Sequence, residues 1–459
     1  MEINRDILQD LKLWKNNPHR KPLILQGAKQ VGKSFVLKKF GEQCFKKCVL
    51  IDFDLEPEHK TEFAKTKNPH RLISYISAVK GIKINPKDTL LIFDEIQECN
   101  DALNSLKYFC EQMPEQAVVC AGSLLGVALK REGTSFPVGK VDFMTLYPVS
   151  FKEFLALYNK QLSQLLEQQV EILKKKVDLV PEIIHNQLIE AYKIYLCCGG
   201  MPETVGVYLE TSNWNDIDKI SNQILTAYTL DFSKHINNKD IPRVHKLWNT
   251  IHDNLGKEDR KFKYAMIEKS ARARDYEDAV EWLTLTGLVH RVFEVQTLRL
   301  PLSSCKNAAA FKLYLSDVGL LRTKFRLDPQ TIINGDRLFI EFKGILTENY
   351  VLQSIVRQLG RDIFYWVSGN TAEIEFVVQQ SQKIVPIEVK SALSVKPKSL
   401  SEYRKKHLPK LSVRLSLKNV TKNDDLLNLP LYLVDYLSQL LGCRGLSAVG
   451  VGKKQGQRI

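Results

Sequence analysis

The spacing of two glycines, a lysine and a serine near the amino terminus constrains the fold more than any other feature. Residues 22–40 read PLILQGAKQVGKSFVLKKF, so Gly27, Gly32, Lys33 and Ser34 follow the G-x-x-x-x-G-K-[ST] pattern of a phosphate-binding P-loop. The glycines allow a tight turn whose N–H groups point at a polyphosphate, and the lysine adds a positive charge. The apolar run before the loop predicts a buried parallel strand, and the residues after it predict a helix whose amino end faces the anion. The pattern therefore predicts a nucleoside triphosphate site.

A second apolar run predicts the other half of a hydrolytic site. Residues 90–93 (LLIF) are typical of a central strand that is covered on both faces. The carboxylates that follow have separate predicted roles: Asp94 holds Mg²⁺ together with Ser34, and Glu95 polarises the attacking water. A further strand at 117–121 is followed by Ser123, which is either a γ-phosphate or water sensor or the cap of the next helix. The predicted nucleotide contacts are Gly27, Ala28, Lys29, Gln30, Val31, Gly32, Lys33, Ser34 and Phe35, and the predicted catalytic residues are Lys33, Glu95 and Ser123.

Length and composition limit the class of protein. A chain of 459 residues is too long for a single core, so two to four domains are expected. No apolar run approaches the length of a membrane span, and residues 1–17 predict an amphipathic helix rather than a signal peptide. The nine cysteines form no C-x-x-C pair, and Cys197 and Cys198 are adjacent. This spacing predicts neither a metal nor a disulfide framework, and it favours a cytoplasmic protein.

The positive charge is concentrated near the carboxyl terminus. The net charge is +14, and residues 383–459 contain 15 Lys and Arg against 5 Asp and Glu. A basic region of this kind suits a polyanion such as DNA or RNA. A solvated surface with a basic tail is the alternative that charge alone leaves open.

The predicted fold class is α/β, with five segments. They are a P-loop ATPase core (1–160), a helical region (161–240), a winged-helix-like region (241–300), a nuclease-like α/β domain (301–440) and a basic flexible tail (441–459). In the winged-helix region, helices are expected at 244–251, 264–270 and 276–285, followed by a β-wing at 288–295. Arg272 and Arg274 precede the third helix, where a DNA-reading helix presents phosphate or base contacts. Such modules also serve purely for packing, so both roles stay open.

Charged residues near the carboxyl terminus predict a second metal site. Glu348 lies in an expected helix, Glu375 in the strand EIEFV, and Glu388 and Lys390 in the strand VPIEVK. Strand alternation places Glu388 and Lys390 on one face. Carboxylates on neighbouring strands beside a lysine can hold Mg²⁺ and position water, as in restriction-endonuclease-like enzymes. An exposed strand with alternating charges is the competing interpretation.

Several motifs together resemble a widespread family of prokaryotic AAA+-superfamily P-loop ATPases that carry a carboxyl-terminal domain of unknown function. The motifs are GAKQVGKS, LIFDEIQ, AGSLLG, SFPVGKVDFMTLYPVSFKEF, GGMPE, DFSKH, FKLYLSDVGLL, LTENYV and PIEVKS, and they extend over nearly the whole chain. The resemblance implies an AAA+-like core, a winged-helix region and a domain related to the PD-(D/E)XK nuclease fold. It implies a nucleotide site at Gly27, Gly32, Lys33, Ser34, Asp94 and Glu95, and a nuclease-like site at Glu348, Glu375, Glu388 and Lys390.

Two positions depart from the family pattern. Relatives commonly have Asp where this chain has Glu375, and the longer side chain disturbs octahedral Mg²⁺ geometry. Many relatives also have Gly-Arg where this chain has Gly139-Lys140, and lysine cannot reproduce the planar fork of an arginine finger. Arg131 is a nearby substitute. Slow or partner-dependent hydrolysis is therefore expected.

Three functions are compatible with the sequence. The favoured one is a Mg²⁺-dependent ATP-hydrolysing switch that is coupled to the binding or processing of DNA or RNA. The alternatives are an ATP-gated metal-dependent nuclease and an ATP-bound protein-interaction scaffold with a degenerate nuclease fold. AAA+ relatives often act as rings or dimers, so a homo-oligomer or a protein partner is also expected.

Overall fold

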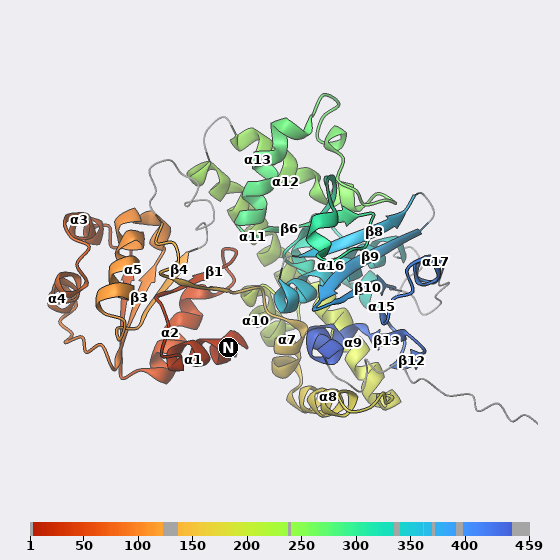
Figure 1. The fold of residues 1–459 in the computed structure, drawn as a ribbon, viewed down its shortest axis with the longest axis horizontal. Coiled ribbons are helices and arrows are strands. Elements are labelled where there is room, and N and C mark those ends of the chain that lie inside the picture. Colours follow the sequence, from red (N-terminus) through yellow and green to blue (C-terminus); the bar gives the residue numbers. More distant parts are fainter. Residues whose placement is uncertain are drawn as a thin grey trace, which may run out of the picture. The chain divides into compact units, whose positions relative to one another are not determined.

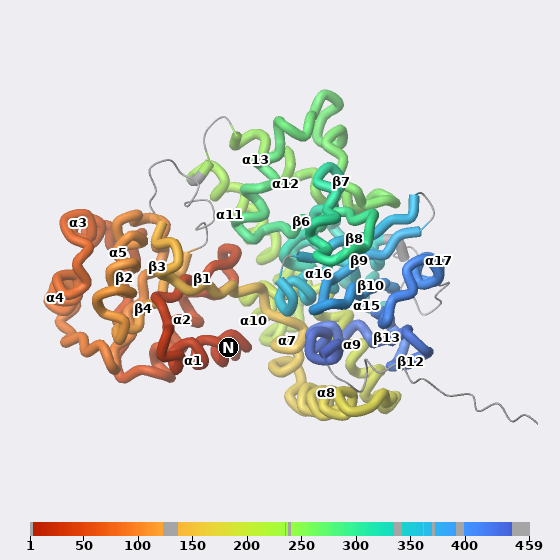
Figure 2. The backbone as a smooth tube through the Cα atoms, in the orientation of Figure 1, coloured from red at the N-terminus to blue at the C-terminus, as the bar shows by residue number. Residues whose placement is uncertain are grey.

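The chain divides into two compact units, which are described separately. The computed structural model describes residues 3–122, 136–236, 240–334, 340–360, 362–369, 372–391 and 398–442. The first unit contains Met1–Val149 and Glu277–Leu288, and the second contains Ser150–Tyr276 and Val289–Ile459. Many of the helices and strands are labelled in Figure 1, and Figure 2 traces the same backbone. The boundaries expected at residues 240 and 300 both fall inside the second unit.

The first unit is built on a five-stranded parallel sheet of order β2-β3-β4-β1-β5. Each apolar run that was expected to form a strand overlaps a strand of this sheet, which confirms the α/β class of the core. β3 has neighbours on both sides, and all of its residues are buried. The strands are β1 (Leu23–Gln26), β2 (Lys47–Asp52), β3 (Thr89–Asp94), β4 (Val118–Gly122) and β5 (Asp142–Thr145).

Helices cover both faces of this sheet. Leu91 and Phe93 of β3 pack in one core cluster with side chains of α3, α4 and α5. Leu90 points the other way, towards Gly41 of α2. The alternation of side chains along a strand explains why such a strand is apolar at every position. The helical elements of this unit are α1 (Ile7–Asn16), α2 (Lys33–Cys44), α3 (Glu58–Lys65), α4 (Pro69–Lys80), η1 (Ile96–Glu98), α5 (Asn100–Gln112) and most of α13 (Ala273–Leu285).

The second unit begins with a helical segment. Its helices are α7 (Phe151–Tyr158), α8 (Lys160–Leu173), α9 (Glu182–Cys198), α10 (Pro202–Thr211), α11 (Trp214–His235) and α12 (Ile241–Leu255), followed by η2 (Tyr264–Met266). The helical region expected from residue 161 includes the amphipathic helix α8, in which Leu162, Leu166, Val170 and Leu173 are buried.

The carboxyl-terminal part of this unit is an eight-stranded mixed sheet of order β12-β13-β11-β10-β9-β8-β6-β7. Leu400 and Tyr403 of α17 pack in one core cluster with strand residues such as Trp366 and Ile374. α16 contacts β7 and β10. The strands are β6 (Val289–Val295), β7 (Lys306–Leu315), β8 (Ile363–Ser368), β9 (Ala372–Gln380), β10 (Lys383–Val389), β11 (Ser412–Ser416), β12 (Thr421–Asn423) and β13 (Leu426–Pro430). The accompanying helical elements are η3 (Leu302–Cys305), α14 (Val318–Lys324), α15 (Pro329–Asn334), α16 (Ile340–Leu359), α17 (Lys398–His407), η5 (Leu431–Tyr436) and α18 (Leu437–Gly442).

The region expected to be a winged helix differs in two elements. The helix predicted at 264–270 is wrong, because the N–H groups of Met266 and Ile267 bond to carbonyls three residues back and form only the 3₁₀ turn η2. The strand predicted at 288–295 is present as β6. It pairs with β7 and β8, and it therefore belongs to the eight-stranded sheet. This sheet crosses the boundary that was expected at residue 300.

The GGMPE motif forms a turn that opens α10. Gly199 has a φ of +71°, and a Cβ atom there would lie 2.3 Å from Oδ1 of Asp317. The N–H of Gly200 donates to Oδ2 of Asp317 at 2.6 Å. Asp317 also caps α14 by accepting from the N–H of Leu320. Only glycine fits this close approach, so the motif joins the α9–α10 turn to α14.

Two expectations concern the chain ends. The amphipathic amino-terminal helix is confirmed as α1, whose residues Leu8, Leu11 and Trp14 are buried. The basic tail at 441–459 lies almost entirely outside the described residues. Among the helices of the described chain, none combines the length and the apolarity needed to cross a membrane.

Candidate functional site

The P-loop connects β1 to α2. Three of its residues have positive φ angles: Gly27 (+150°), Gln30 (+64°) and Gly32 (+90°). A Cβ atom on Gly27 would lie 2.2 Å from the carbonyl oxygen of Leu146, so no larger residue fits there without a backbone shift. α2 starts at Lys33, directly after the loop. The loop thus leads into the amino end of a helix, where unpaired N–H groups attract anions.

Lys33 is buried inside this loop. Its Nζ donates to the carbonyl oxygens of Gly27 at 3.0 Å and Ala28 at 2.9 Å. Burial lowers the pKa of Lys33 to about 8, and the nearby charges of Glu95 and Asp94 offset part of this effect. The ammonium group therefore contacts the loop carbonyls and is close enough to two carboxylates for their charges to act on it.

The two predicted carboxylates lie at the carboxyl end of β3. Asp94 ends the strand, is 5% exposed and pairs in register with Asp52 of β2. Its Oδ1 accepts from the N–H of Glu95 at 3.1 Å. Glu95 has a φ of +48°, an uncommon conformation for a residue other than glycine, and its carboxylate accepts from the side-chain amide of Gln97. Backbone strain of this kind is often found at functional sites.

The structure brings most of the predicted nucleotide residues together. Ala28 and Val31 are buried, Lys29 and Ser34 are partly buried, and Gln30 and Phe35 are exposed. Ser34 is the second residue of α2. The predicted sensor Ser123 lies outside the described residues, as does the proposed finger substitute Arg131. Lys140 pairs with Glu111 of α5 at 3.0 Å.

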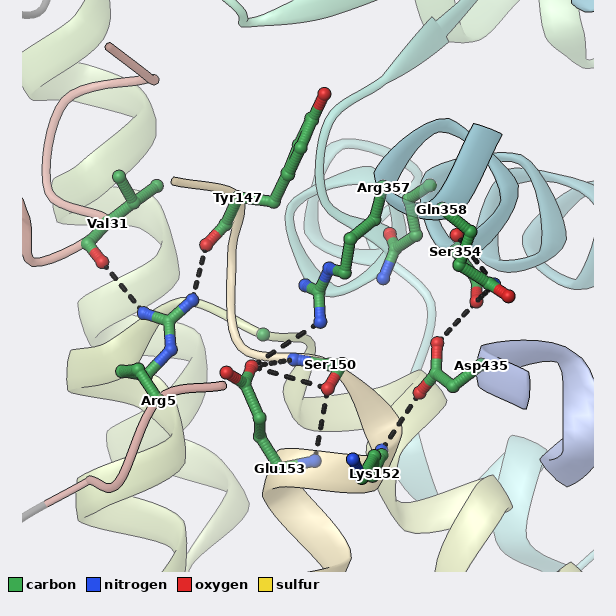
Figure 3. A network of polar contacts seen from close by, with 12 residues as sticks. Arg5, Val31, Tyr147, Ser150, Lys152, Glu153, Ser354, Arg357, Gln358 and Asp435 are labelled. Atoms are coloured by element: carbon green, nitrogen blue, oxygen red, sulfur yellow. Dashed lines mark hydrogen bonds and ion pairs between the residues drawn. The ribbon is translucent and has the colours of Figure 1, made fainter. Parts of the chain in front are cut away.

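Two residues at this site have no recognisable signal in the sequence. Arg5 precedes α1, and its guanidinium donates to the carbonyl oxygens of Val31 at 3.0 Å and Tyr147 at 2.6 Å (Figure 3). Gly287 follows α13, and a Cβ atom there would lie 3.4 Å from the backbone nitrogen of Ala28. Both contacts join the loop to segments remote in sequence, and no local pattern marks them.

Three residues of the second predicted constellation lie close together: Glu375 on β9, Glu388 on β10 and Lys390 directly after β10. Nζ of Lys390 lies 2.9 Å from Oε1 of Glu375 and 3.6 Å from Oε1 of Glu388. Arg414 of β11 donates through Nε to Oε2 of Glu388 at 2.7 Å. Burial lowers the pKa of Lys390, but Glu375 and Glu388 more than offset this, and the pKa is raised overall. Glu375, Glu388 and Lys390 thus converge, and the residue that sequence reasoning missed is Arg414.

Glu348 has different partners. Its carboxylate forms an ion pair with Arg260, and Oε2 accepts from the hydroxyl of Tyr314 at 3.1 Å. Arg260 lies between α12 and η2 and has a φ of +49°. A buried carboxylate with an arginine and a tyrosine is already satisfied.

These residues do not fit a divalent metal ion. The three carboxylates of Glu348, Glu375 and Glu388 face the three cations Arg260, Lys390 and Arg414, which balances the charge. Of the six carboxylate oxygens, only Oε1 of Glu388 is without a hydrogen bond. In the described parts of the chain, no three His, Cys, Asp or Glu side chains form a group that could hold a metal. Mg²⁺ is usually held by one or two carboxylates that are free to face it, and here each carboxylate already faces a cation.

Family models cover three segments of the chain. Residues 19–155 match the AAA domain. Residues 189–331 and 343–433 match two models that are each described as a domain of unknown function, DUF8612 and DUF4143. No curated protein matches the chain.

Similar solved structures are remote in sequence. A Walker-type ATPase of Pyrococcus abyssi is 15% identical, with a TM-score of 0.44 and coverage of 71% of this chain and 96% of that chain. The ORC2 protein of Aeropyrum pernix is 11% identical, with a TM-score of 0.33 and coverage of 73% and 95%. DnaA of Aquifex aeolicus is 13% identical, with a TM-score of 0.25 and coverage of 62% and 88%. These values are too low to assign a function.

The family match and the loop geometry agree on the first unit. Its parallel sheet, P-loop and buried lysine are the parts that an ATPase core requires. The chain therefore contains a P-loop ATPase domain of the AAA type at residues 19–155, joined to two segments whose family models carry no functional description.

Proposed function

We propose that this chain is a Mg²⁺-dependent ATPase whose nucleotide state controls the binding or processing of nucleic acid. One observation carries the ATPase assignment. The charges of Asp94 and Glu95 act on the pKa of Lys33, at the start of α2, so the phosphate-binding and carboxylate halves of the site lie close to each other. Crevices at the carboxyl ends of parallel strands are where open α/β sheets bind their ligands.

Each residue has a distinct part in this proposal. The loop N–H groups and Lys33 would hold the β- and γ-phosphates of ATP, and Ser34 and Asp94 would hold Mg²⁺. Mg²⁺ supplies charge neutralisation during phosphoryl transfer. Glu95 would orient the attacking water, and Gln97 fixes the position of its carboxylate. Ser123 stays a proposed sensor.

Helix α13 supports the coupling to nucleic acid. Arg272 and Arg274 at its amino end are exposed, and the side chain of Arg274 is 75% exposed. At its carboxyl end, Gly287 lies beside Ala28 of the P-loop. A phosphate backbone held by the two arginines would act on one end of a helix whose other end leads to Gly287, beside the nucleotide loop.

The ATPase assignment is tested by two substitutions. Lys33→Ala should abolish ATP binding, because it removes the buried ammonium group. Glu95→Gln should keep binding but lose at least 100-fold in kcat, because the amide cannot polarise water. Nucleotide binding and phosphate release would be measured with Mg²⁺ for both variants. Normal turnover by Glu95→Gln would show that another residue acts on the water.

The nucleic-acid assignment is tested by Arg272→Ala combined with Arg274→Ala. ATP hydrolysis should be stimulated by DNA or RNA in the native protein and much less in the double variant. The slope of log affinity against log salt concentration should also fall in magnitude by about 2, because two phosphate contacts are lost. Arg71→Ala with Lys87→Ala is a matched control, because it removes the same charge from exposed positions of the first unit. An equal loss in both double variants would indicate a general charge effect.

An ATP-bound protein-interaction scaffold is the second candidate. The observation that favours it is the charge balance around Glu388, which argues against metal-dependent cleavage. Incubation of labelled DNA and RNA with Mg²⁺ or Mn²⁺ separates the alternatives. Turnover that is unaffected by nucleic acid, without cleavage, would favour the scaffold, and cleavage that is lost in Glu388→Ala would favour the nuclease. We also propose that the protein acts in the cytoplasm, as a homo-oligomer or with a protein partner.

A further inference from the structure

Arg5 is a buried cation that donates hydrogen bonds to two backbone carbonyls, those of Val31 and Tyr147. It is 4% exposed, and Figure 3 shows its guanidinium between the carbonyl oxygens of Val31 and Tyr147. A buried guanidinium is costly unless its N–H groups are satisfied. The planar fork of arginine can reach two acceptors at once, which lysine cannot do with the same geometry.

The contact with Val31 determines how the P-loop presents its next N–H group. In a trans peptide, the carbonyl of one residue and the N–H of the next point in opposite directions. Because Arg5 holds the carbonyl of Val31, the N–H of Gly32 must point away from Arg5. Gly32 has a φ of +90°, and glycine peptides in this region reorient easily when nothing holds them.

The contact with Tyr147 connects the same guanidinium to the segment that packs against Gly27, at the start of the P-loop. The N–H of Leu146 donates to the carbonyl oxygen of Gln26 at 2.8 Å. The carbonyl oxygen of Leu146 occupies the place where a Cβ atom of Gly27 would lie. Arg5 thus connects Val31, near the end of the P-loop, to residues 146–147, which contact the start of the loop at Gly27.

We propose that Arg5 is a positioning residue of the nucleotide site, which fixes the Val31–Gly32 peptide so that the loop is ready to receive phosphate. This inference rests on the proposed ATP binding. Arg5 does not need to touch the nucleotide, because it acts through the backbone of the loop. Its loss should weaken the binding of ATP more than it weakens the fold.

Arg20 provides a matched control in the same unit. Its guanidinium also donates to two backbone carbonyls, those of Lys15 at 3.0 Å and Glu115 at 2.7 Å. Neither acceptor belongs to the P-loop. Arg20→Ala therefore removes the same kind of contact without a direct effect on the nucleotide loop.

The test compares Arg5→Ala, Arg5→Lys and Arg20→Ala in the full chain. We expect Arg5→Ala to raise the Kd and KM for MgATP at least tenfold, with a smaller change in kcat. Arg20→Ala should leave these constants within twofold. Arg5→Lys should fall between the native protein and Arg5→Ala, and millimolar guanidinium should restore part of the affinity of Arg5→Ala.

A second readout does not depend on ATP. Hydrogen exchange of a peptide spanning residues 27–33 should be faster in nucleotide-free Arg5→Ala than in Arg20→Ala. Equal exchange and equal ATP affinity in these two variants would overturn the inference. If Arg5→Ala does not fold, Arg5→Lys decides the question by the same comparison. Native protein that fails to bind MgATP would refute the proposed function, whereas faster exchange in Arg5→Ala would still establish the positioning of the loop.

Discussion

Lys33 shows how burial prepares a single side chain for its ligand. Among the described residues, loop carbonyls and two nearby carboxylates stabilise the charge of its ammonium group, and burial lowers its pKa to about 8. Phosphate groups of ATP would stabilise the charged form and raise the pKa. Binding above pH 8 should therefore take up a proton, and the affinity should fall by up to about tenfold per pH unit above 8.

Calorimetry can measure this proton uptake. Titration with MgATP at pH 8.5 in two buffers of different ionisation enthalpy should give different apparent binding enthalpies. Lys33→Arg is the control, because its guanidinium stays charged at this pH. Equal enthalpies in both buffers for the native protein would contradict the prediction.

Asp317 is a second residue whose burial has a measurable consequence. It is fully buried, and burial raises its pKa from 3.8 to about 6, although backbone N–H groups, such as those of Gly200 and Leu320, lower it in part. Because the folded pKa is the higher one, its favourable contribution to stability is complete below about pH 4. It is lost as the pH rises through 6, by about 3 kcal/mol.

Comparison of the native protein with Asp317→Asn isolates this contribution. The amide does not titrate, and all other carboxylates are the same in both proteins. Urea denaturation between pH 4.5 and 7.5 should show the native protein losing stability relative to the variant as the pH rises. A difference in the free energy of unfolding that stays constant over this range would mean that Asp317 is ionised throughout.

At the scale of elements, the cluster on β9, β10 and β11 illustrates a carboxylate group that is compensated internally. Glu388 is fully buried, and Arg414 is its closest cation. Arg414→Ala should destabilise the protein by about 3 kcal/mol, because it leaves a buried charge with only Lys390 as a partner at 3.6 Å. Urea denaturation of this variant, of Glu388→Gln and of the double variant would measure the coupling between the two residues.

Divalent metal provides the complementary observation. Without nucleotide, 5 mM Mg²⁺ or Mn²⁺ should not raise the thermal stability of the native protein, because each carboxylate of the cluster is already paired with a cation. A stabilisation that disappears in Glu388→Gln would show that these carboxylates bind metal after all.

Elements that depend on local sequence were predictable. The P-loop and the strand that ends at Asp94 both follow from short runs of residues with a fixed chemical requirement. The 3₁₀ turn η2 was not predictable, because helical periodicity says little about whether each N–H bonds three or four residues back. The contacts of Arg5 and Gly287 were also out of reach, since their partners are distant in sequence.

At the scale of the whole molecule, the placement of β6 shows the same limit. A strand was expected there, but its pairing with β8 joins Phe293 to Phe364, which are 71 residues apart in sequence. The choice between a small wing and an eight-stranded sheet depends on which remote strand supplies the partner. Within the nuclease-like pattern, Glu375, Glu388 and Lys390 lie together. The pairing of Glu388 with Arg414 and of Glu348 with Arg260 comes from other elements.

The first unit is discontinuous, since it combines residues up to Val149 with Glu277–Leu288. A ribosome completes the five strands of its sheet long before it reaches Gly287. The nascent ATPase unit must therefore wait, without the segment that lies against Ala28, while the intervening helices are made. Expression of residues 1–149 alone would yield a P-loop without the segment Glu277–Leu288, which contacts it through Gly287. In the order of synthesis, this segment is the last part of the nucleotide unit to be made.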